Sequence, residues 1–165
     1  MLKIKVIADN ILNLTDARYF AAYGVDYLVF NQEEIPPQTI REIKDWVEGV
    51  SILLDVRTQL TPSLLDFILS LSPEGYVSDD VDLLNDLKRQ LPEATFFMRE
   101  KNGNLVDLAN KEAMPYVKLG SSPESLKEII ESENISGIIV EGEPEEKVGF
   151  KNFDELDEIF ELIAI

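Results

Sequence analysis

Short, mostly apolar runs alternate with segments of helical periodicity along the whole chain. The runs are largely continuous rather than alternating apolar and polar, which is typical of strands buried on both faces. Strands are predicted at residues 3–8, 26–30, 51–56, 75–78, 94–98, 115–119 and 135–140. Because strands of this kind occur in parallel sheets covered by helices, the pattern indicates an α/β protein.

Between these runs, apolar residues recur every three or four positions, which predicts helices with one buried face. Helices are expected over residues 14–23, 36–47, 62–72, 80–91 and 105–111, with two more opening at 122 and 152. Asn13 and Thr61 stand where a side chain caps a first helical turn, and Gly24 stands where a left-handed residue ends a helix. A turn is expected at 101–104, before the short helix 105–111.

The alternation gives seven strand–helix units in 165 residues. Short connections between alternating strands and helices favour a parallel sheet. Seven units are one short of a (β/α)₈ barrel, which normally needs ~200 residues or more. The pattern therefore predicts either a trimmed barrel or an open doubly wound sheet. Since no linker or low-complexity segment interrupts it, one domain is expected over residues 1–165.

The composition excludes several kinds of catalytic and metal site. The chain has no His and no Cys, which excludes a Ser-His-Asp triad, a thiolate nucleophile and a Cys-based zinc site. With 15 Lys and Arg against 32 Asp and Glu, the net charge is −17, so nucleic acids and anionic membranes are not expected partners. No apolar run approaches a membrane span, and the first nine residues turn acidic too early for a signal peptide. A cytoplasmic location is expected.

Three motifs resemble the phosphoribosylanthranilate isomerase family. The family opens with a strand and helix of the form K-I-K-I-C-G-I-T-N-L-E-D-A, and residues 5–17 read KVIADNILNLTDA, followed by Ala-Ala-x-Gly-x-Asp at 21–26. Residues 137–145 and 148–152 align without a gap to the family's last unit. Residues 118–125 match its A-G-G-L-N-P-E-N segment. Because the matches lie at both ends of the chain, the resemblance covers the whole fold.

The resemblance implies a TIM-barrel-like parallel (β/α) barrel shortened to about seven β-α units. The family's sixth β-α unit has no counterpart here, so a barrel of seven strands, or one that does not close, is expected. The family catalyses an Amadori isomerisation of a phosphoribosylamine in tryptophan biosynthesis. By resemblance, a sugar-phosphate-like small molecule is the expected ligand. No cofactor is expected, and the sequence does not indicate an oligomeric state.

The resemblance also assigns roles to residues. In the family the general base is a Cys that ends the first strand, and Asp9 stands at that position, either as a base or as a polar turn residue. The family's general acid is an Asp on the sixth strand, so no residue here inherits that role. These losses argue against the isomerase activity itself, although descent from the family is the favoured interpretation.

The expected phosphate grip is divided between two segments. Gly120, Ser121 and Ser122 precede a helix that Pro123 opens, where backbone N–H groups can hold an anion. Gly142 is the second phosphate-binding candidate, but it lies between two carboxylates, Glu141 and Glu143, where the family has S-S-G. Lys118 and Glu141 are candidates for substrate binding, and Lys118 is also expected to pair with a nearby carboxylate.

Independently of any family, carboxylates gather where the predicted strands end. They are Asp9, Asp55, Asp79, Asp80, Glu100, Glu141 and Glu143. Converging carboxylates suit Mg²⁺ or Ca²⁺, although no residue is assigned as a metal ligand. Three hypotheses therefore remain open: an isomerase with Asp9 as base, a non-catalytic relative that binds another ligand or a protein, and a carboxylate-lined divalent-cation site.

Overall fold

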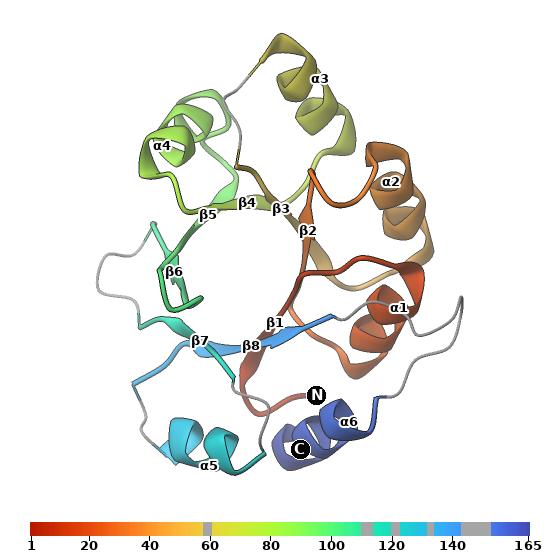
Figure 1. Cartoon of the computed structure of the whole chain (residues 1–165), viewed down its shortest axis with the longest axis vertical. Coiled ribbons are helices and arrows are strands. Elements are labelled where there is room, and N and C mark those ends of the chain that lie inside the picture. The colour runs from red at the N-terminus through yellow and green to blue at the C-terminus, as the bar shows by residue number, and fades with distance from the viewer. Residues whose placement is uncertain (58–60, 110–113, 120–122, 132–133, 143–152) are drawn as a thin grey trace.

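Eight strands close into a barrel in the computed structural model (Figure 1), which describes residues 1–165 except 58–60, 110–113, 120–122, 132–133 and 143–152. The strands are β1 (Lys5–Asp9), β2 (Tyr27–Asn31), β3 (Ser51–Asp55), β4 (Gly75–Ser78), β5 (Thr95–Arg99), β6 (Leu105–Asp107), β7 (Tyr116–Lys118) and β8 (Gly137–Glu141). Pairing of β1 with β8 closes the ring, from Lys5 opposite Gly137 to Asp9 opposite Glu141. The barrel prediction is confirmed, and the open sheet is excluded.

Helices cover the outside of the ring. In the described residues they are α1 (Leu14–Tyr23), α2 (Pro37–Trp46), α3 (Pro62–Leu71), α4 (Val81–Gln90), α5 (Pro123–Glu131) and α6 (Asp154–Ile163). The predicted caps are confirmed: the Asn13 side chain accepts from the Asp16 amide, Thr61 accepts from Leu64, and Gly24 ends α1 with φ +79°. Among the described residues, no helix has the length and apolar character that a membrane crossing requires.

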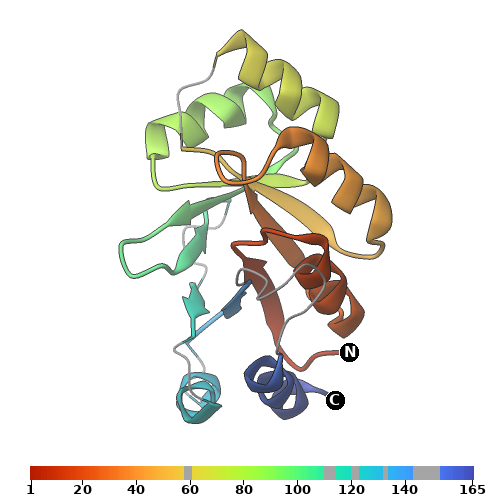
Figure 2. The same ribbon diagram turned by 45° about the vertical axis from the view of Figure 1, so that its right-hand side comes forward.

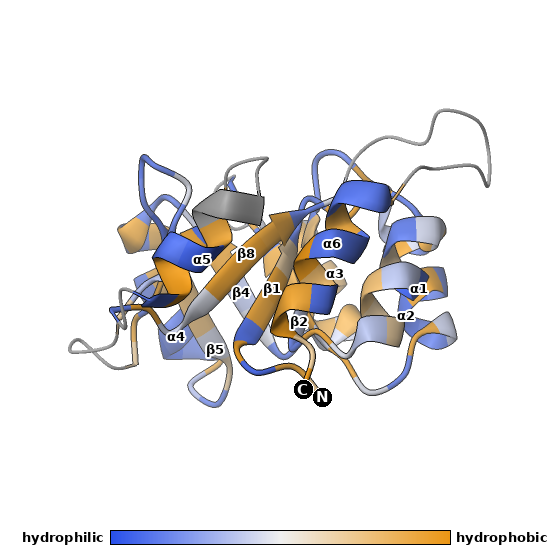
Figure 3. Cartoon of the chain, turned by 90° about the horizontal axis from the view of Figure 1, so that it is seen from below, coloured by the Kyte–Doolittle hydropathy of each residue, from blue (hydrophilic) through white to orange (hydrophobic). Residues whose placement is uncertain are grey.

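Two apolar layers hold the barrel together. One fills the interior of the ring with side chains from all eight strands, including Leu53, Val77 and Phe97. The other lies between the strands and the helices, and it is larger. Figure 3 shows the apolar colour running along the strands and on the helix faces turned toward them. Because successive strand residues point to opposite sides, one continuous apolar run supplies both layers.

The segment between β5 and β7 differs from the prediction. The helix expected over 105–111 is wrong at its start, because Leu105–Asp107 is a strand that pairs antiparallel with both β5 and β7. The expectation of seven strands or an unclosed ring is therefore also wrong, since this strand completes the circle. The rest of the expected segment, 110–111, lies outside the described residues.

The physical reason for the antiparallel strand is a hairpin. Glu100 donates its amide to the Asn104 carbonyl at 2.9 Å, and Gly103 takes φ +89°, a conformation that favours glycine. Asn-Gly between two apolar runs is a strong hairpin signal, and it lies here at 102–103. The hairpin replaces a full β-α unit, so in the described residues no helix covers the outside of β6 (Figures 1 and 2).

Candidate functional site

The carboxyl ends of the parallel strands bring polar side chains to one face of the barrel. Asp9 ends β1, Asn31 ends β2 and Asp55 ends β3, and all three are buried, at 5%, 6% and 2% exposure. Together with Arg99 at the end of β5 and Glu141 at the end of β8, they line a cavity of about 260 Å³, which we call the mouth cavity. Active sites of (β/α) barrels form at this face.

Arg99 joins the ends of three strands. Its Nη1 donates to Asp9 Oδ2 at 2.6 Å, and its Nη2 donates to Asp9 Oδ1 and Asp55 Oδ2, both at 3.1 Å. The contact with Asp9 is bidentate, the geometry that a planar guanidinium and a carboxylate favour. The Arg99 side chain is only 17% exposed, so these ion pairs are held largely away from water.

The electrostatics of the mouth cavity favour the charged state of its arginines. Burial lowers the pKa of Arg99, but hydrogen bonds and charge from Asp9 and Asp55 outweigh it and leave that pKa above its usual value. Arg57, two residues beyond β3, adds a second cation on Asp55 with an Nη2–Oδ2 distance of 3.1 Å. The hydrogen bond to Asp55 is the main reason that the pKa of Arg57 is raised.

Asp9, the predicted base, has both carboxylate oxygens engaged. Besides Arg99, its Oδ1 accepts the amide of Asn10 at 2.9 Å. Asn10 has φ +55°, a left-handed conformation that asparagine tolerates better than most residues. The structure thus places Asp9 at the mouth, as expected for the family position, but in a closed ion pair.

Lys118 and Glu141, the predicted substrate-binding pair, lie beside each other at the rim. Lys118 Nζ is 2.9 Å from a Glu141 carboxylate oxygen, and both side chains are about two-fifths exposed, at 40% and 42%. The expectation that Lys118 pairs with a nearby acid is confirmed. The Lys118 side chain also lies over Gly103 of the hairpin, where a Cβ would stand 2.7 Å from its Cδ.

The predicted phosphate grip is only partly described. Gly120, Ser121, Ser122 and Glu143 lie outside the described residues. Gly142 is buried, and its N–H donates to the Asp9 carbonyl at 2.9 Å. A Cβ there would meet Asp16 Oδ2 at 2.6 Å and the Asn10 carbonyl oxygen at 2.8 Å, which explains glycine. A phosphate contact through this amide would require its present hydrogen bond to break.

The strand-end carboxylates do not converge on one point. In the part of the chain that the structure describes, no group of three acidic side chains is placed to hold a metal ion. Asp9 and Asp55 are turned to Arg99, Glu141 is turned to Lys118, and Asp80 caps α4 by accepting the amides of Asp82 and Leu83. For these residues the hypothesis of a divalent-cation site is wrong.

A sixth strand exists, but its aspartate lies away from the mouth, opposite the middle of β5. β6 runs antiparallel, so Asp107 pairs in register with Phe97 while Leu105, at the opposite end of the strand, pairs with Arg99. The charge of Asp107 raises the pKa of Tyr27 and Tyr116, although burial is the larger cause for both. No described residue of β6 therefore places an acid at the mouth cavity.

Sequence reasoning missed Arg57 and Lys101, which also line the mouth cavity. It considered cations on strands, whereas these two lie in the connections after β3 and β5. The signal available was their place directly beyond predicted strand ends.

Comparison with known proteins gives a consistent answer about the fold. No family model and no curated protein matches the chain. Solved structures do: phosphoribosylanthranilate isomerase from Thermus thermophilus matches with TM-score 0.68 at 17% identity, over 96% of this chain and 97% of the other. The enzymes from Pyrococcus furiosus (TM-score 0.67, 13% identity) and Thermotoga maritima (0.64, 16%) match over the same shares. At the level of the barrel, the resemblance read from the sequence is therefore confirmed: this chain has the fold of the phosphoribosylanthranilate isomerases.

Proposed function

We propose that this protein is a divergent relative of the phosphoribosylanthranilate isomerases that binds a small sugar-phosphate-like anion at the mouth cavity without isomerising it. The observation that carries the proposal is the bidentate ion pair between Arg99 and Asp9. In this ion pair, the carboxylate at the position of the family's base is buried, and its charge is balanced by the guanidinium.

An anionic ligand is supported by the distribution of cations. Four of the chain's 15 Lys and Arg line the mouth cavity, against four of its 32 acids. The four cations are Arg57, Arg99, Lys101 and Lys118. The wall is formally neutral on a protein of net charge −17, so it repels an anion less than the average surface of the chain does. Arg57 is 46% exposed and can reach a ligand without leaving Asp55.

Loss of isomerisation is supported by the state of Asp9. A general base must have an oxygen within hydrogen-bond reach of the substrate proton. Here Oδ2 accepts from Arg99 at 2.6 Å, and Oδ1 accepts from both Arg99 and the Asn10 amide. Asp107, on the antiparallel strand, does not replace the missing acid at this face.

The binding half of the proposal is tested by thermal melting with two probes. One is inorganic phosphate. The other is reduced 1-(o-carboxyphenylamino)-1-deoxyribulose 5-phosphate, which a solved phosphoribosylanthranilate isomerase structure contains. A ligand at a hundred times its Kd adds ~2.7 kcal/mol of stability, a shift of a few degrees for a chain of this size.

A matched pair of variants locates the binding. Arg57→Gln removes a cation of the mouth cavity and is expected to lower the affinity for the phosphorylated probe about two- to fivefold. Arg41→Gln removes a cation on α2, where it pairs with Ser70 away from the mouth cavity, and is expected to leave affinity unchanged. Equal effects of the two variants, or no melting shift with either probe, would refute anion binding at the mouth cavity.

A further inference from the structure

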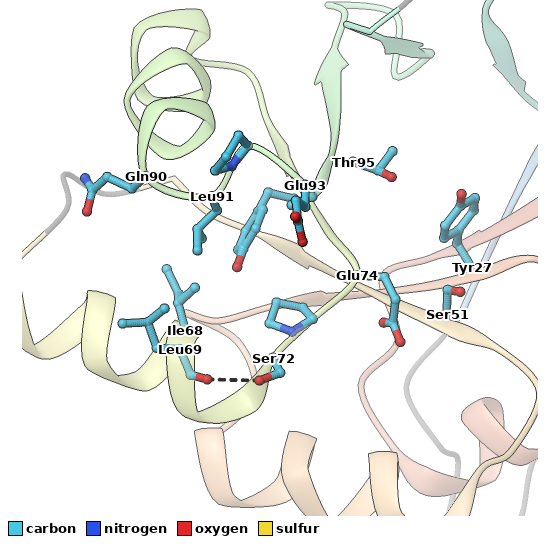
Figure 4. Close-up of a pocket in the computed structure, with 14 residues that line it drawn as sticks. Tyr27, Ser51, Ile68, Leu69, Ser72, Glu74, Gln90, Leu91, Glu93 and Thr95 are labelled. Atoms are coloured by element: carbon cyan, nitrogen blue, oxygen red, sulfur yellow. Dashed lines mark hydrogen bonds between the residues drawn. The ribbon is translucent and has the colours of Figure 1, made fainter.

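A second cavity lies at the other end of the barrel, where the strands begin. Its volume is about 800 Å³, and we call it the base cavity. The carboxyl ends of α3 and α4 form two walls, and the starts of β3, β4 and β5 form its floor (Figure 4). This volume falls within the range of small-molecule sites, roughly 300–1,000 Å³.

The two helix walls of the base cavity are apolar. Figure 4 shows Leu91, which follows α4, pointing toward Ile68 and Leu69 of α3. Leu69 is 51% exposed, a high value for leucine in a helix that packs against a sheet. The space between the walls therefore offers apolar surface that no described part of the chain covers.

Tyr76, on the outer face of β4, supplies a polar group that the fold does not use. Its side chain is 2% exposed, and its ring stacks on Phe96 at 5.7 Å. Its hydroxyl lines the base cavity and has no hydrogen-bond partner among the described residues. Burial raises the pKa of this hydroxyl to about 12, so it is neutral and able to donate or accept. The hydroxyl oxygen is not among the buried polar atoms that lack a partner, so it is open to the cavity, where a ligand can donate to it or accept from it.

The charge in the base cavity has one sign. Among the described residues that line it, Glu74 and Glu93 are acidic and none is basic. Glu74 is committed to the fold, because one of its oxygens accepts the Ile52 amide at 2.6 Å. Glu93 is exposed, and its carboxylate lies over the cavity in Figure 4. An exposed carboxylate beside two apolar walls complements a ligand that carries one positive charge on an apolar framework.

We propose that the base cavity binds a small amine with an apolar or aromatic body. The ammonium donates to the Glu93 carboxylate and to the Tyr76 hydroxyl oxygen, while the body packs between Ile68 and Leu91. Nothing in the mouth cavity takes part, so this site is separate from the proposed anion site.

The test is a titration of the whole chain by amide NMR with three probes of one shape. Phenethylamine carries the positive charge, 2-phenylethanol is neutral, and phenylacetate is negative. Phenethylamine is expected to move the amide signals of Ser72, Glu74 and Thr95 in a saturable way, with the alcohol weaker and the acid inactive. Equal binding of all three probes, or shifts confined to other residues, would overturn the proposal.

Two variants and one control assign the contacts. Glu93→Gln is expected to raise the Kd for phenethylamine about two- to fivefold, whereas Asp66→Asn, on an exposed position of α3 outside the cavity, leaves it unchanged. Tyr76→Phe is expected to raise the Kd by a similar factor without lowering the melting temperature, because the lost hydroxyl has no partner in the fold. A Tyr76→Phe protein that melts lower but binds normally would show a structural role and contradict the proposal.

Discussion

The two ends of this barrel satisfy their polar groups in opposite ways. At the mouth cavity, Asp9 and Asp55 are buried and both are bound by Arg99, so charge is balanced within the fold. At the base cavity, a tyrosine hydroxyl without a described protein partner and an exposed carboxylate face about 800 Å³ of space with both polar and apolar lining, against about 260 Å³ at the mouth. The end at which relatives of this fold carry their chemistry is the end that this chain has filled from within.

A barrel fold shared with other proteins does not by itself supply the same functional site. The mouth cavity retains the placement expected of a (β/α) barrel site, but its central carboxylate is held by Arg99 from across the ring. A ligand there meets arginines that are already paired with Asp9 and Asp55, although the buried Nε of Arg99 has no partner among the described residues. A ligand at the base cavity meets the Tyr76 hydroxyl, which is not engaged by a described residue.

The largest effect is expected from Arg99→Met. It leaves Asp9 without its buried counter-charge, and breaking a buried pair in this way costs roughly 3–5 kcal/mol. Arg57→Met is the control, because its side chain is 46% exposed and its loss should cost less than about 1 kcal/mol. Urea unfolding measures both. Similar costs for the two variants would mean that the Arg99 pair does not hold the mouth together.

The next largest effect is a loss of stability expected at alkaline pH, and it distinguishes the base cavity from the mouth cavity. The pKa of Tyr76, at the base cavity, and of Tyr116, inside the barrel, is raised from 10.0 to about 12 by burial. The unfolded chain then loses these protons first, so stability is complete below pH 10 and falls as pH rises toward 12. Each tyrosine contributes about 2 to 3 kcal/mol of that fall.

Urea unfolding across this pH range, with phenolate absorbance, measures the alkaline loss. Tyr76→Phe removes its share and leaves that of Tyr116 and of Tyr19, Tyr23 and Tyr27, whose pKa values are also raised. The mouth arginines stay charged because their pKa values are raised. A pH profile that Tyr76→Phe does not change would show that the hydroxyl at the base cavity is effectively solvated.

The smallest effect is expected from Glu141→Gln at the rim of the mouth. The Lys118–Glu141 pair is about two-fifths exposed on both sides, so its loss should cost less than about 1 kcal/mol. The cost should shrink further in high salt, because exposed charges are screened. Melting in low and high salt measures it. A larger loss of stability that does not depend on salt would mean that this pair behaves like the buried ion pairs of Arg99.

Local signals in the sequence predicted most of the fold. The caps at Asn13 and Thr61 and the stop at Gly24 follow from short-range rules, and the structure confirms each. The error at Leu105–Asp107 arose where an apolar triplet fits either a helix or a strand. The preceding Asn102-Gly103 turn decides in favour of a hairpin, and that signal was present in the sequence.

The site was harder to predict because its interactions cross the ring. Asp9 and Arg99 are 90 residues apart, and only barrel closure brings the ends of β1 and β5 together. The sequence therefore predicted the place of Asp9 but not its partner. The unpartnered hydroxyl of Tyr76 left no sequence signal, because a tyrosine in an apolar run reads as an ordinary core residue.

The most direct test of the central claim, that Arg99 holds Asp9 out of catalysis, is a turnover measurement. Purified protein is incubated with phosphoribosylanthranilate, and its conversion is compared for the parent chain and Asp9→Asn. No conversion above the uncatalysed rate is expected in either protein, under conditions where the reduced deoxyribulose phosphate raises the parent's melting temperature. Conversion by the parent that Asp9→Asn abolishes would contradict the account and make Asp9 the base of an active isomerase.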